Sequence, residues 1–259
     1  MEQDLTLAST YLDRITNTPV VGPITSQAMT IAEEGKIRIC YAPFDYVERK
    51  ARIVIVGITP GQVQAINALT TAHTAMRQNK PVLDALIEAK LTASFSGPLR
   101  SNLVAMLDAI GIATYLGLDS TAWLFHPGSQ EIHFTSALRY PVFVNGKNYN
   151  GTPDMLRTPI LRHMIETHLA EEARLLPNAL WLPLGPRVDK ALQHLVGKGF
   201  LDPKRILNGL PHPSGANAER IAVFLGRKAP EKASRKTNPD TLLTAFHALK
   251  AKVSMQKGA

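Results

Sequence analysis

Arg52-Ile53-Val54-Ile55-Val56-Gly57 is the clearest strand signal in the sequence and indicates the fold class. Its run of β-branched apolar residues ends in glycine, a pattern typical of a parallel strand buried on both faces. Later segments alternate between the same kind of apolar run and segments with helical periodicity. The predicted strands are 132–138, 180–185 and 206–210, and the predicted helices are 62–78, 81–91, 98–110, 158–176, 217–226 and 239–252, with one more beginning at Pro186.

Strands that alternate with helices imply βαβ crossovers and a parallel sheet covered on both faces. We therefore expect an α/β protein, a three-layer α/β/α sandwich around a short, mainly four-stranded parallel sheet. The 259 residues fit one large domain, or at most two small ones, and we expect one. Residues 1–50 are expected to form a helical arm with an irregular continuation, and residues 227–259 a basic loop followed by a helix.

The charge balance is the first indication of a partner. Lys and Arg number 29 and Asp and Glu 21, so the net charge is +8. This balance favours a polyanion such as nucleic acid, although a soluble protein can also simply be basic. The basic loop 226–238 is open to the same two interpretations, a DNA contact or a polar connector.

Cysteine usage and hydropathy limit the other classes. Cys40 is the only cysteine, which excludes an intramolecular disulfide, a Cys-rich zinc site and a Cys-ligated iron–sulfur cluster. It suits a reducing compartment, and we expect a cytoplasmic protein. No apolar run is long enough for a membrane span, and the N-terminus lacks a signal-peptide layout. We expect no metal, because His163 and His168 are five residues apart and cannot share one face of a helix.

Two loops after predicted strands carry unusual chemistry: Gly57-Ile58-Thr59-Pro60-Gly61 and His212-Pro213-Ser214-Gly215-Ala216-Asn217. Ligands of open parallel sheets bind at the carboxyl ends of the strands, where both loops are expected. Their Gly and Pro residues form tight turns. Ser and Asn side chains can donate hydrogen bonds to phosphate oxygens, and a His can donate to a developing anion. Each loop alone also has an ordinary structural interpretation. Neither a P-loop nor a Gly-x-Ser-x-Gly elbow occurs.

Together the loops resemble the uracil-DNA glycosylase superfamily. The 57–61 loop looks like its first motif, and the 212–217 loop like its second, the His-Pro-Ser loop that inserts at the DNA minor groove. Three more stretches are similar to segments of the single-strand-selective monofunctional and thermophilic-type branches: Tyr41-Ala42-Pro43-Phe44-Asp45-Tyr46, Phe95-Ser96-Gly97 with the helix behind it, and Gly146-Lys147-Asn148 followed by Thr152-Pro153. The resemblance covers residues 37–226.

The resemblance implies a monomeric, cofactor-free DNA glycosylase that flips out a nucleotide and hydrolyses its N-glycosidic bond, leaving an abasic site. The resemblance also implies which residues act on the base and which contact the DNA. The implied catalytic residues are Thr59 and His212; the implied base pocket is Gly57, Ile58, Phe95, Ser136, Asn145 and Asn148; the implied DNA-binding residues are Pro60, Gly61, Pro213, Ser214, Gly215, Asn217 and Arg220.

The chain departs from the superfamily pattern at the positions of its usual acids. Members carry Asp or Asn at the third position of the first motif or Glu at the second, where this chain has Thr59 and Ile58. Ser136 stands where many members read the base with Asn. Because cleavage in the superfamily is thought to be dissociative, stabilisation of the departing base anion can supply much of the rate. We therefore expect Thr59 to help position water and His212 to stabilise the leaving base.

Several alternatives stay open at the level of sequence. Phe95 stacks on the base or belongs to the core, and Thr59 positions water or caps the following turn. Asn145, Asn148 and Asn150 bind sugar hydroxyls of a bulky base, or they form a β-turn. The substrate is a uracil-like or modified pyrimidine, and one variant of this function is a bacterial anti-phage enzyme that excises glucosylated hydroxymethylcytosine. The alternative function is a non-catalytic binder of damaged or modified DNA.

Overall fold

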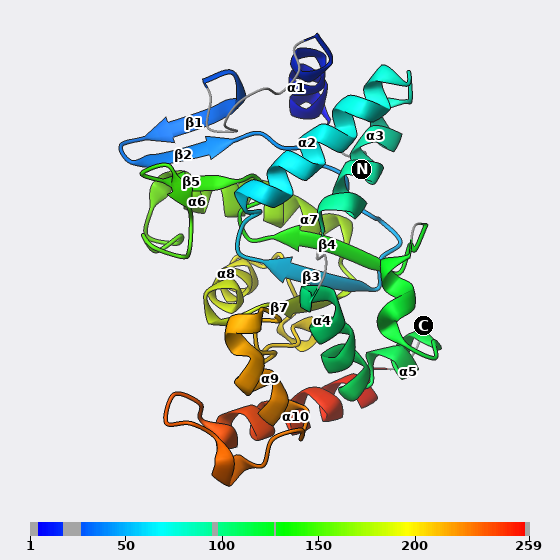
Figure 1. Ribbon diagram of the computed structural model, residues 1–259, viewed down its shortest axis with the longest axis vertical. Helices are drawn as coiled ribbons and strands as arrows, with labels where there is room; N and C mark the ends of the chain where they lie inside the picture. Colours follow the sequence, from blue (N-terminus) through cyan, green and yellow to red (C-terminus); the bar gives the residue numbers. More distant parts are fainter. Residues whose placement is uncertain (1–4, 18–26, 95–97, 127, 257–259) are drawn as a thin grey trace.

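The computed structural model describes residues 5–17, 27–94, 98–126 and 128–256, and a parallel sheet lies at its centre (Figure 1). Strand β3 (Ile53–Gly57) lies between β4 (Ile132–Ser136) and β7 (Leu180–Pro183). The three strands are parallel, and their register pairs Gly57 with Ser136 and Val56 with Pro183. The carboxyl ends of all three strands therefore meet at one edge.

The fourth predicted strand is the main correction to the predicted sheet. Ile206 forms only an isolated parallel bridge with Trp181, and the N–H of Leu207 donates to the Trp181 carbonyl oxygen at 2.8 Å. Gly209 then leaves the extended region with a φ of +110°, and Pro211 has no N–H to donate to a ladder. Among the residues that the structure describes, the parallel sheet consequently has three strands and one bridge, and the predicted four strands are not confirmed.

Helices cover both faces of this sheet, which confirms the α/β class. Because successive strand side chains point to opposite faces, Val54 and Val56 belong to one buried apolar cluster and Ile53 and Ile55 to another. The first cluster includes residues of α1 (Thr6–Asn17), α2 (Gln62–Arg77), α3 (Val82–Ala93), α6 (Pro159–Met164), α7 (Ala170–Leu175) and α8 (Pro186–Gly197). The second includes residues of α4 (Pro98–Ala109), α5 (Ile112–Leu116), α9 (Ala218–Phe224) and α10 (Pro239–Ser254).

A second, antiparallel sheet is formed by segments that were not predicted to be strands. Its strands β1 (Thr30–Glu34), β2 (Ile37–Cys40), β5 (Val142–Val144) and β6 (Lys147–Asn148) lie in that order. The predicted irregular continuation of the N-terminal arm is therefore wrong for β1 and β2, and no strand was predicted where β5 and β6 lie. Asn145 and Gly146 adopt φ angles of +51° and +72°, as a type I′ turn requires, and Asn-Gly between apolar residues is a strong hairpin signal.

The strand order identifies the edge at which a ligand is expected. The chain passes from β3 to β4 on one side and then crosses to β7 on the other side of β3. The crevice between the carboxyl ends of β3 and β7 is therefore a topological switch point, where open α/β sheets bind ligands. The described helices include none that is both long and apolar enough to cross a membrane.

Candidate functional site

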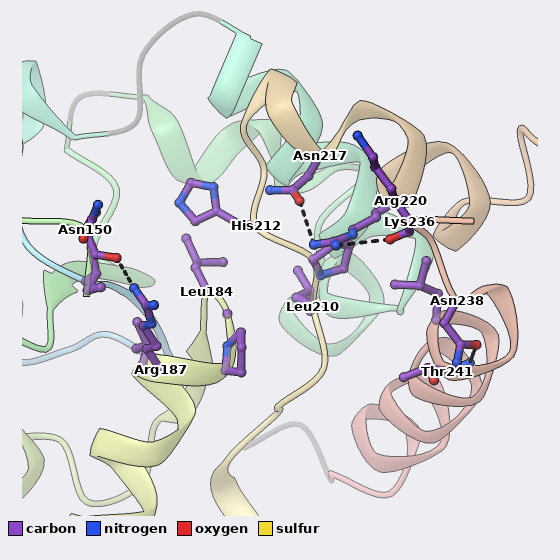
Figure 2. Close-up of a pocket in the computed structure, with 16 residues that line it drawn as sticks. Asn150, Leu184, Arg187, Leu210, His212, Asn217, Arg220, Lys236, Asn238 and Thr241 are labelled. Carbon is purple, nitrogen blue, oxygen red and sulfur yellow. Dashed lines mark hydrogen bonds between the residues drawn. The ribbon is translucent and has the colours of Figure 1, made fainter. Parts of the chain in front are cut away.

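Two adjoining cavities lie at the carboxyl edge of the parallel sheet and share Ile58 and His212. We call the larger one, of about 590 Å³, the wide cleft, and it reaches from the start of α8 to α9 and α10 (Figure 2). We call the smaller one, of about 140 Å³, the inner pocket. His212 therefore lies at the boundary between the inner pocket and the wide cleft.

The inner pocket brings together the first loop, the end of β4 and the second loop. Its lining includes the predicted residues Gly57, Ile58, Thr59, Pro60, Ser136 and His212. Backbone hydrogen bonds fix this arrangement, since the Gly57 carbonyl oxygen accepts from the N–H of Ala137 at 2.8 Å and that of Ile58 from the N–H of Leu138 at 3.0 Å. Predicted site residues that are far apart in the sequence thus line one cavity.

The ring of His212 has a defined tautomer. Its Nδ1 accepts a hydrogen bond from the backbone N–H of Ser214 at 3.2 Å, so the proton is assigned to Nε2. Partial burial lowers its pKa below the usual value, which favours the neutral ring. Figure 2 shows the ring between Asn150 and Asn217. His212 can therefore donate from Nε2 to an acceptor at the mouth of the inner pocket.

The second loop is held from both sides. The Pro213 carbonyl oxygen accepts from Nδ2 of Asn102 on α4 at 2.9 Å. Oγ of Ser214 accepts from Nδ2 of Asn217 at 3.2 Å, while Gly215 is exposed beside them. These contacts fix the loop that carries His212 without using its Nε2.

The Thr59 hydroxyl is a backbone clamp. It donates to the Tyr140 carbonyl oxygen at 3.0 Å and accepts from the N–H of Val142 at 3.2 Å. The hydroxyl thereby ties the first loop to the connection between β4 and β5. Its donor is committed to protein, so at most one lone pair is left for the expected role in positioning water. It does not cap the turn, which was the alternative.

Two of the predicted pocket residues lie elsewhere. Asn145 forms the exposed hairpin turn, and Oδ1 of Asn148 accepts from the N–H of Gln62 at 3.0 Å, at the start of α2. Neither residue is among those that line the inner pocket or the wide cleft. Their positions therefore do not support their assignment to the base pocket. Asn145 instead has the positive φ that a turn needs, and Asn148 accepts a hydrogen bond from a backbone N–H at the start of a helix. Phe95 lies outside the described residues.

Gly61, predicted to bind DNA, begins α2. Its N–H donates to Oε1 of Gln64 at 3.0 Å, which is half of a capping arrangement, and its carbonyl oxygen accepts from the N–H of Ala65 at 2.9 Å. Pro60 beside it is buried in the wall of the inner pocket.

Basic side chains line the wide cleft. Arg187 donates to the carbonyl oxygen of Asn150, and Arg220 donates to Oδ1 of Asn217 at 3.2 Å and to the carbonyl oxygen of Lys236 at 3.4 Å (Figure 2). All five residues line the cleft. Arg220 was predicted as a DNA contact, whereas Arg187 was not, because its place at the first turn of α8 is visible only once the sheet edge is assembled.

Sequence reasoning missed two buried cations of the inner pocket, Lys90 and Arg139. Nζ of Lys90 donates to the carbonyl oxygens of Phe44 at 3.2 Å and Tyr46 at 2.5 Å. Lys90 follows Leu86 by four residues on α3 and so lies on the apolar face of that helix. A lysine at such a position was the signal that could have identified it.

A network of buried ionisable groups supports the pocket from behind. Arg139 donates from Nε to Oε1 of Glu172 at 2.8 Å, and Oε2 of Glu172 lies 3.3 Å from Nε2 of His133. Arg139, His133 and Lys90 hold the pKa of Glu172 well below its usual range, although burial opposes them. Burial lowers the pKa of Lys90 to about 8. Glu172 is therefore a carboxylate that balances the charges of Arg139 and Lys90.

The described residues that line the inner pocket include Lys90, Arg139 and His212 and no carboxylate. Buried cations and an oriented N–H facing a small cavity favour an anion or a group that becomes one. The arrangement suits a planar polar ring in the pocket and a phosphate backbone in the cleft.

Comparison with known proteins places the chain in a family. It is similar to the uncharacterized protein YoxB of Bacillus subtilis (strain 168), with 37% identity over 199 residues, which make up 76% of this chain and 78% of the relative. No protein-family model and no solved structure matches the chain. YoxB is described as uncharacterized, so the relationship assigns no activity. An identity of 37% over more than three quarters of both chains nevertheless shows that this chain belongs to the same family as YoxB.

Proposed function

We propose that this protein is a DNA glycosylase that flips a nucleotide into the inner pocket and hydrolyses its N-glycosidic bond. One observation carries the proposal: a small pocket lined by buried cations adjoins a basic cleft at His212. Base-flipping enzymes need a snug site for the base and contacts for the flanking phosphates. The resemblance of the two loops to the uracil-DNA glycosylase motifs supports the same function.

The proposed reaction separates the base as an anion. The C1′–N bond breaks, its electron pair leaves with the base, and the sugar becomes oxocarbenium-like. The N–H of His212 at Nε2 donates to an oxygen of the departing base, and water then adds to C1′ and loses a proton to solvent. Because the lining residues described for the pocket include no carboxylate, stabilisation of the leaving anion is the main catalytic effect in this proposal.

The size of the inner pocket favours a single small base. Its volume of about 140 Å³ is below the roughly 300–1,000 Å³ of sites that bind drug-sized ligands. Asn145 and Asn148, which the sequence offered as contacts for a glucosylated base, lie outside it. Among the proposed substrates, a uracil-like pyrimidine is therefore favoured over glucosylated hydroxymethylcytosine, and repair over anti-phage defence.

The arrangement of the fold is consistent with this proposal. The first loop follows the central strand, and the second follows the Ile206 bridge at the outer edge of β7. A three-layer sandwich with a reduced fourth strand brings both loops to one edge. The chain acts as a monomer in this proposal.

Excision on labelled oligonucleotides tests the function. The panel contains uracil, hypoxanthine, xanthine, hydroxymethylcytosine and glucosylated hydroxymethylcytosine, in single and double strands, and alkali then cleaves abasic products. We expect cleavage at uracil, and we expect His212→Ala to slow it about 100-fold or more, the scale of losing one donor to a developing anion.

The matched control is His163→Ala, since His163 is exposed on α6. It should retain the wild-type rate. Cleavage only at the glucosylated base would reverse the substrate assignment. Binding to modified DNA without cleavage of any member would overturn the proposed activity in favour of a non-catalytic binder.

A further inference from the structure

The inner pocket has a mouth and a floor. His212 lines both the pocket and the wide cleft, so it marks the mouth. Lys90 is only 6% exposed and Thr135 only 9%. Lys90 and Phe134 also line a separate cavity on the far side, together with His133, so they form the inner wall. Lys90 and Thr135 therefore belong to the floor.

Both floor residues have hydrogen-bonding capacity that the described part of the chain does not use. Lys90 has three N–H donors, and the carbonyl oxygens of Phe44 and Tyr46 take two of them. Oγ1 of Thr135 is buried and has no partner within the described residues. Buried polar groups are nearly always paired in native proteins, so an unpaired donor and hydroxyl in the wall of a cavity indicate a polar ligand.

The position of Lys90 is fixed before any ligand arrives. The two backbone carbonyls anchor its ammonium, and Glu172 and Asp45 provide nearby negative charge behind the pocket. A preorganised ammonium can only donate, whereas the hydroxyl of Thr135 can donate or accept. The floor therefore selects a ligand edge that carries a carbonyl oxygen next to a ring N–H or a second acceptor.

The geometry of a flipped pyrimidine determines which edge reaches this floor. Its N1 is bonded to the sugar and must stay at the mouth, so C4 and its substituent point inward. Uracil presents a carbonyl at C4 and an N–H at N3, whereas cytosine presents an amino group and a bare ring nitrogen. The amino group of cytosine would place a donor against the donor of Lys90.

We propose that Lys90 and Thr135 are the specificity-determining residues of the site, with the ammonium donating to the C4 carbonyl and the hydroxyl accepting from the N3 hydrogen of a uracil-type base. This inference rests on the proposed function for its substrate class. It assigns base selection to two residues of α3 and β4 that lie outside the two loops. Ser136 at the end of β4 is then a wall residue and not the main selector.

Binding to non-cleavable DNA tests the assignment apart from catalysis. Oligonucleotides carry 2′-fluoroarabino analogues of uracil, cytosine or 2-pyrimidinone, the last of which lacks both the C4 carbonyl and the N3 hydrogen. We expect the wild type to bind the uracil analogue about 10- to 100-fold more tightly than the 2-pyrimidinone analogue, as for a buried polar contact left unmade.

Lys90→Met and Thr135→Val keep the side-chain volume and remove the polar groups. Each should reduce the preference for uracil over 2-pyrimidinone about 10-fold by weakening uracil binding alone. The controls are Lys50→Met, exposed at the amino end of the sheet, and Thr92→Val, exposed on α3. Both should retain the wild-type preference. If Lys90→Met does not fold, Thr135→Val and the wild-type preference still decide the question.

The two proposals fail in different ways. No preference in the wild type, or a full preference in both floor variants, overturns the assignment of Lys90 and Thr135, even if uracil is excised. A preference that the floor variants abolish, in a protein that excises nothing, supports the assignment and refutes the glycosylase activity.

Discussion

His133 is buried and neutral beneath the candidate site. Its Nδ1 accepts from the backbone N–H of Glu48 at 3.3 Å, so Nε2 carries the proton that faces Glu172. Burial lowers its pKa to about 4, and the nearby Lys90 acts in the same direction. An unfolded chain would protonate this ring near pH 6.5. The residue therefore makes folding stability depend on pH.

The sign of this dependence follows from proton binding. Between pH 6.5 and about 4 the unfolded state holds one more proton than the folded state, so stability falls as the pH falls through that window. The full shift corresponds to about 3 kcal/mol. We predict that His133→Gln loses less stability than the wild type between pH 7 and pH 4.5, measured by urea unfolding. Parallel losses in the two proteins would contradict the prediction, and the exposed His163→Gln should behave as the wild type.

At the scale of elements, Glu219 on α9 organises the basic loop that precedes α10. Its carboxylate accepts from Nζ of Lys228 at 2.6 Å, from Oγ of Ser234 at 2.5 Å and from Oγ1 of Thr237 at 2.6 Å. The loop is thereby folded against α9, and Lys236 lines the wide cleft. The sequence left open whether this loop is a connector, and its position at the cleft is consistent with a DNA contact.

Loss of that anchor should loosen the loop. We predict that Glu219→Gln is cut faster by trypsin at Arg235 and Lys236, because the neutral amide loses its charge-assisted contacts to Lys228 and the two hydroxyls. Mass spectrometry of limited digests would locate and time the cuts. Glu231→Gln, exposed in the same loop, is the matched control. Equal cutting of the two variants would show that Glu219 does not hold the loop.

At the scale of the whole molecule, the distribution of the +8 net charge matters more than its size. Arg187 from α8 and Arg220 from α9 line one cleft although they are far apart in the chain. If DNA lies in the cleft, each phosphate contact releases counterions and adds to the salt dependence of binding.

We predict that Arg187→Ala and Arg220→Ala each weaken DNA binding for all sequences and reduce the slope of log Kobs against log salt by about 1. Fluorescence anisotropy at several salt concentrations measures both effects. Lys50→Ala removes a charge from the opposite edge of the sheet and should leave the slope unchanged. Slopes unaffected by either Arg variant would exclude the cleft as the DNA site.

The α/β class and the place of the two loops follow from the amino-acid sequence alone. Strand β3 was predicted because uninterrupted β-branched residues mark a strand buried on both faces. The two loops were predicted at the carboxyl ends of strands, because their own Gly and Pro residues end the extended segments before them. The β1–β2 and β5–β6 hairpins were missed, although Asn145-Gly146 is a local hairpin signal. The strand at 206–210 was overestimated, because Gly209 and Pro211 end the extended segment soon after the single bridge at Ile206.

Which side chains meet depends on how the elements pack together. Lys90 on α3, Thr135 on β4 and His212 after the Ile206 bridge line one pocket, and no local pattern relates their positions. Thr59 became a backbone clamp and Asn148 a partner of α2 because their neighbours come from distant segments. Periodicity along the chain reports which face of an element is buried, whereas contacts between elements depend on strand order and crossover, which only the assembled sheet sets.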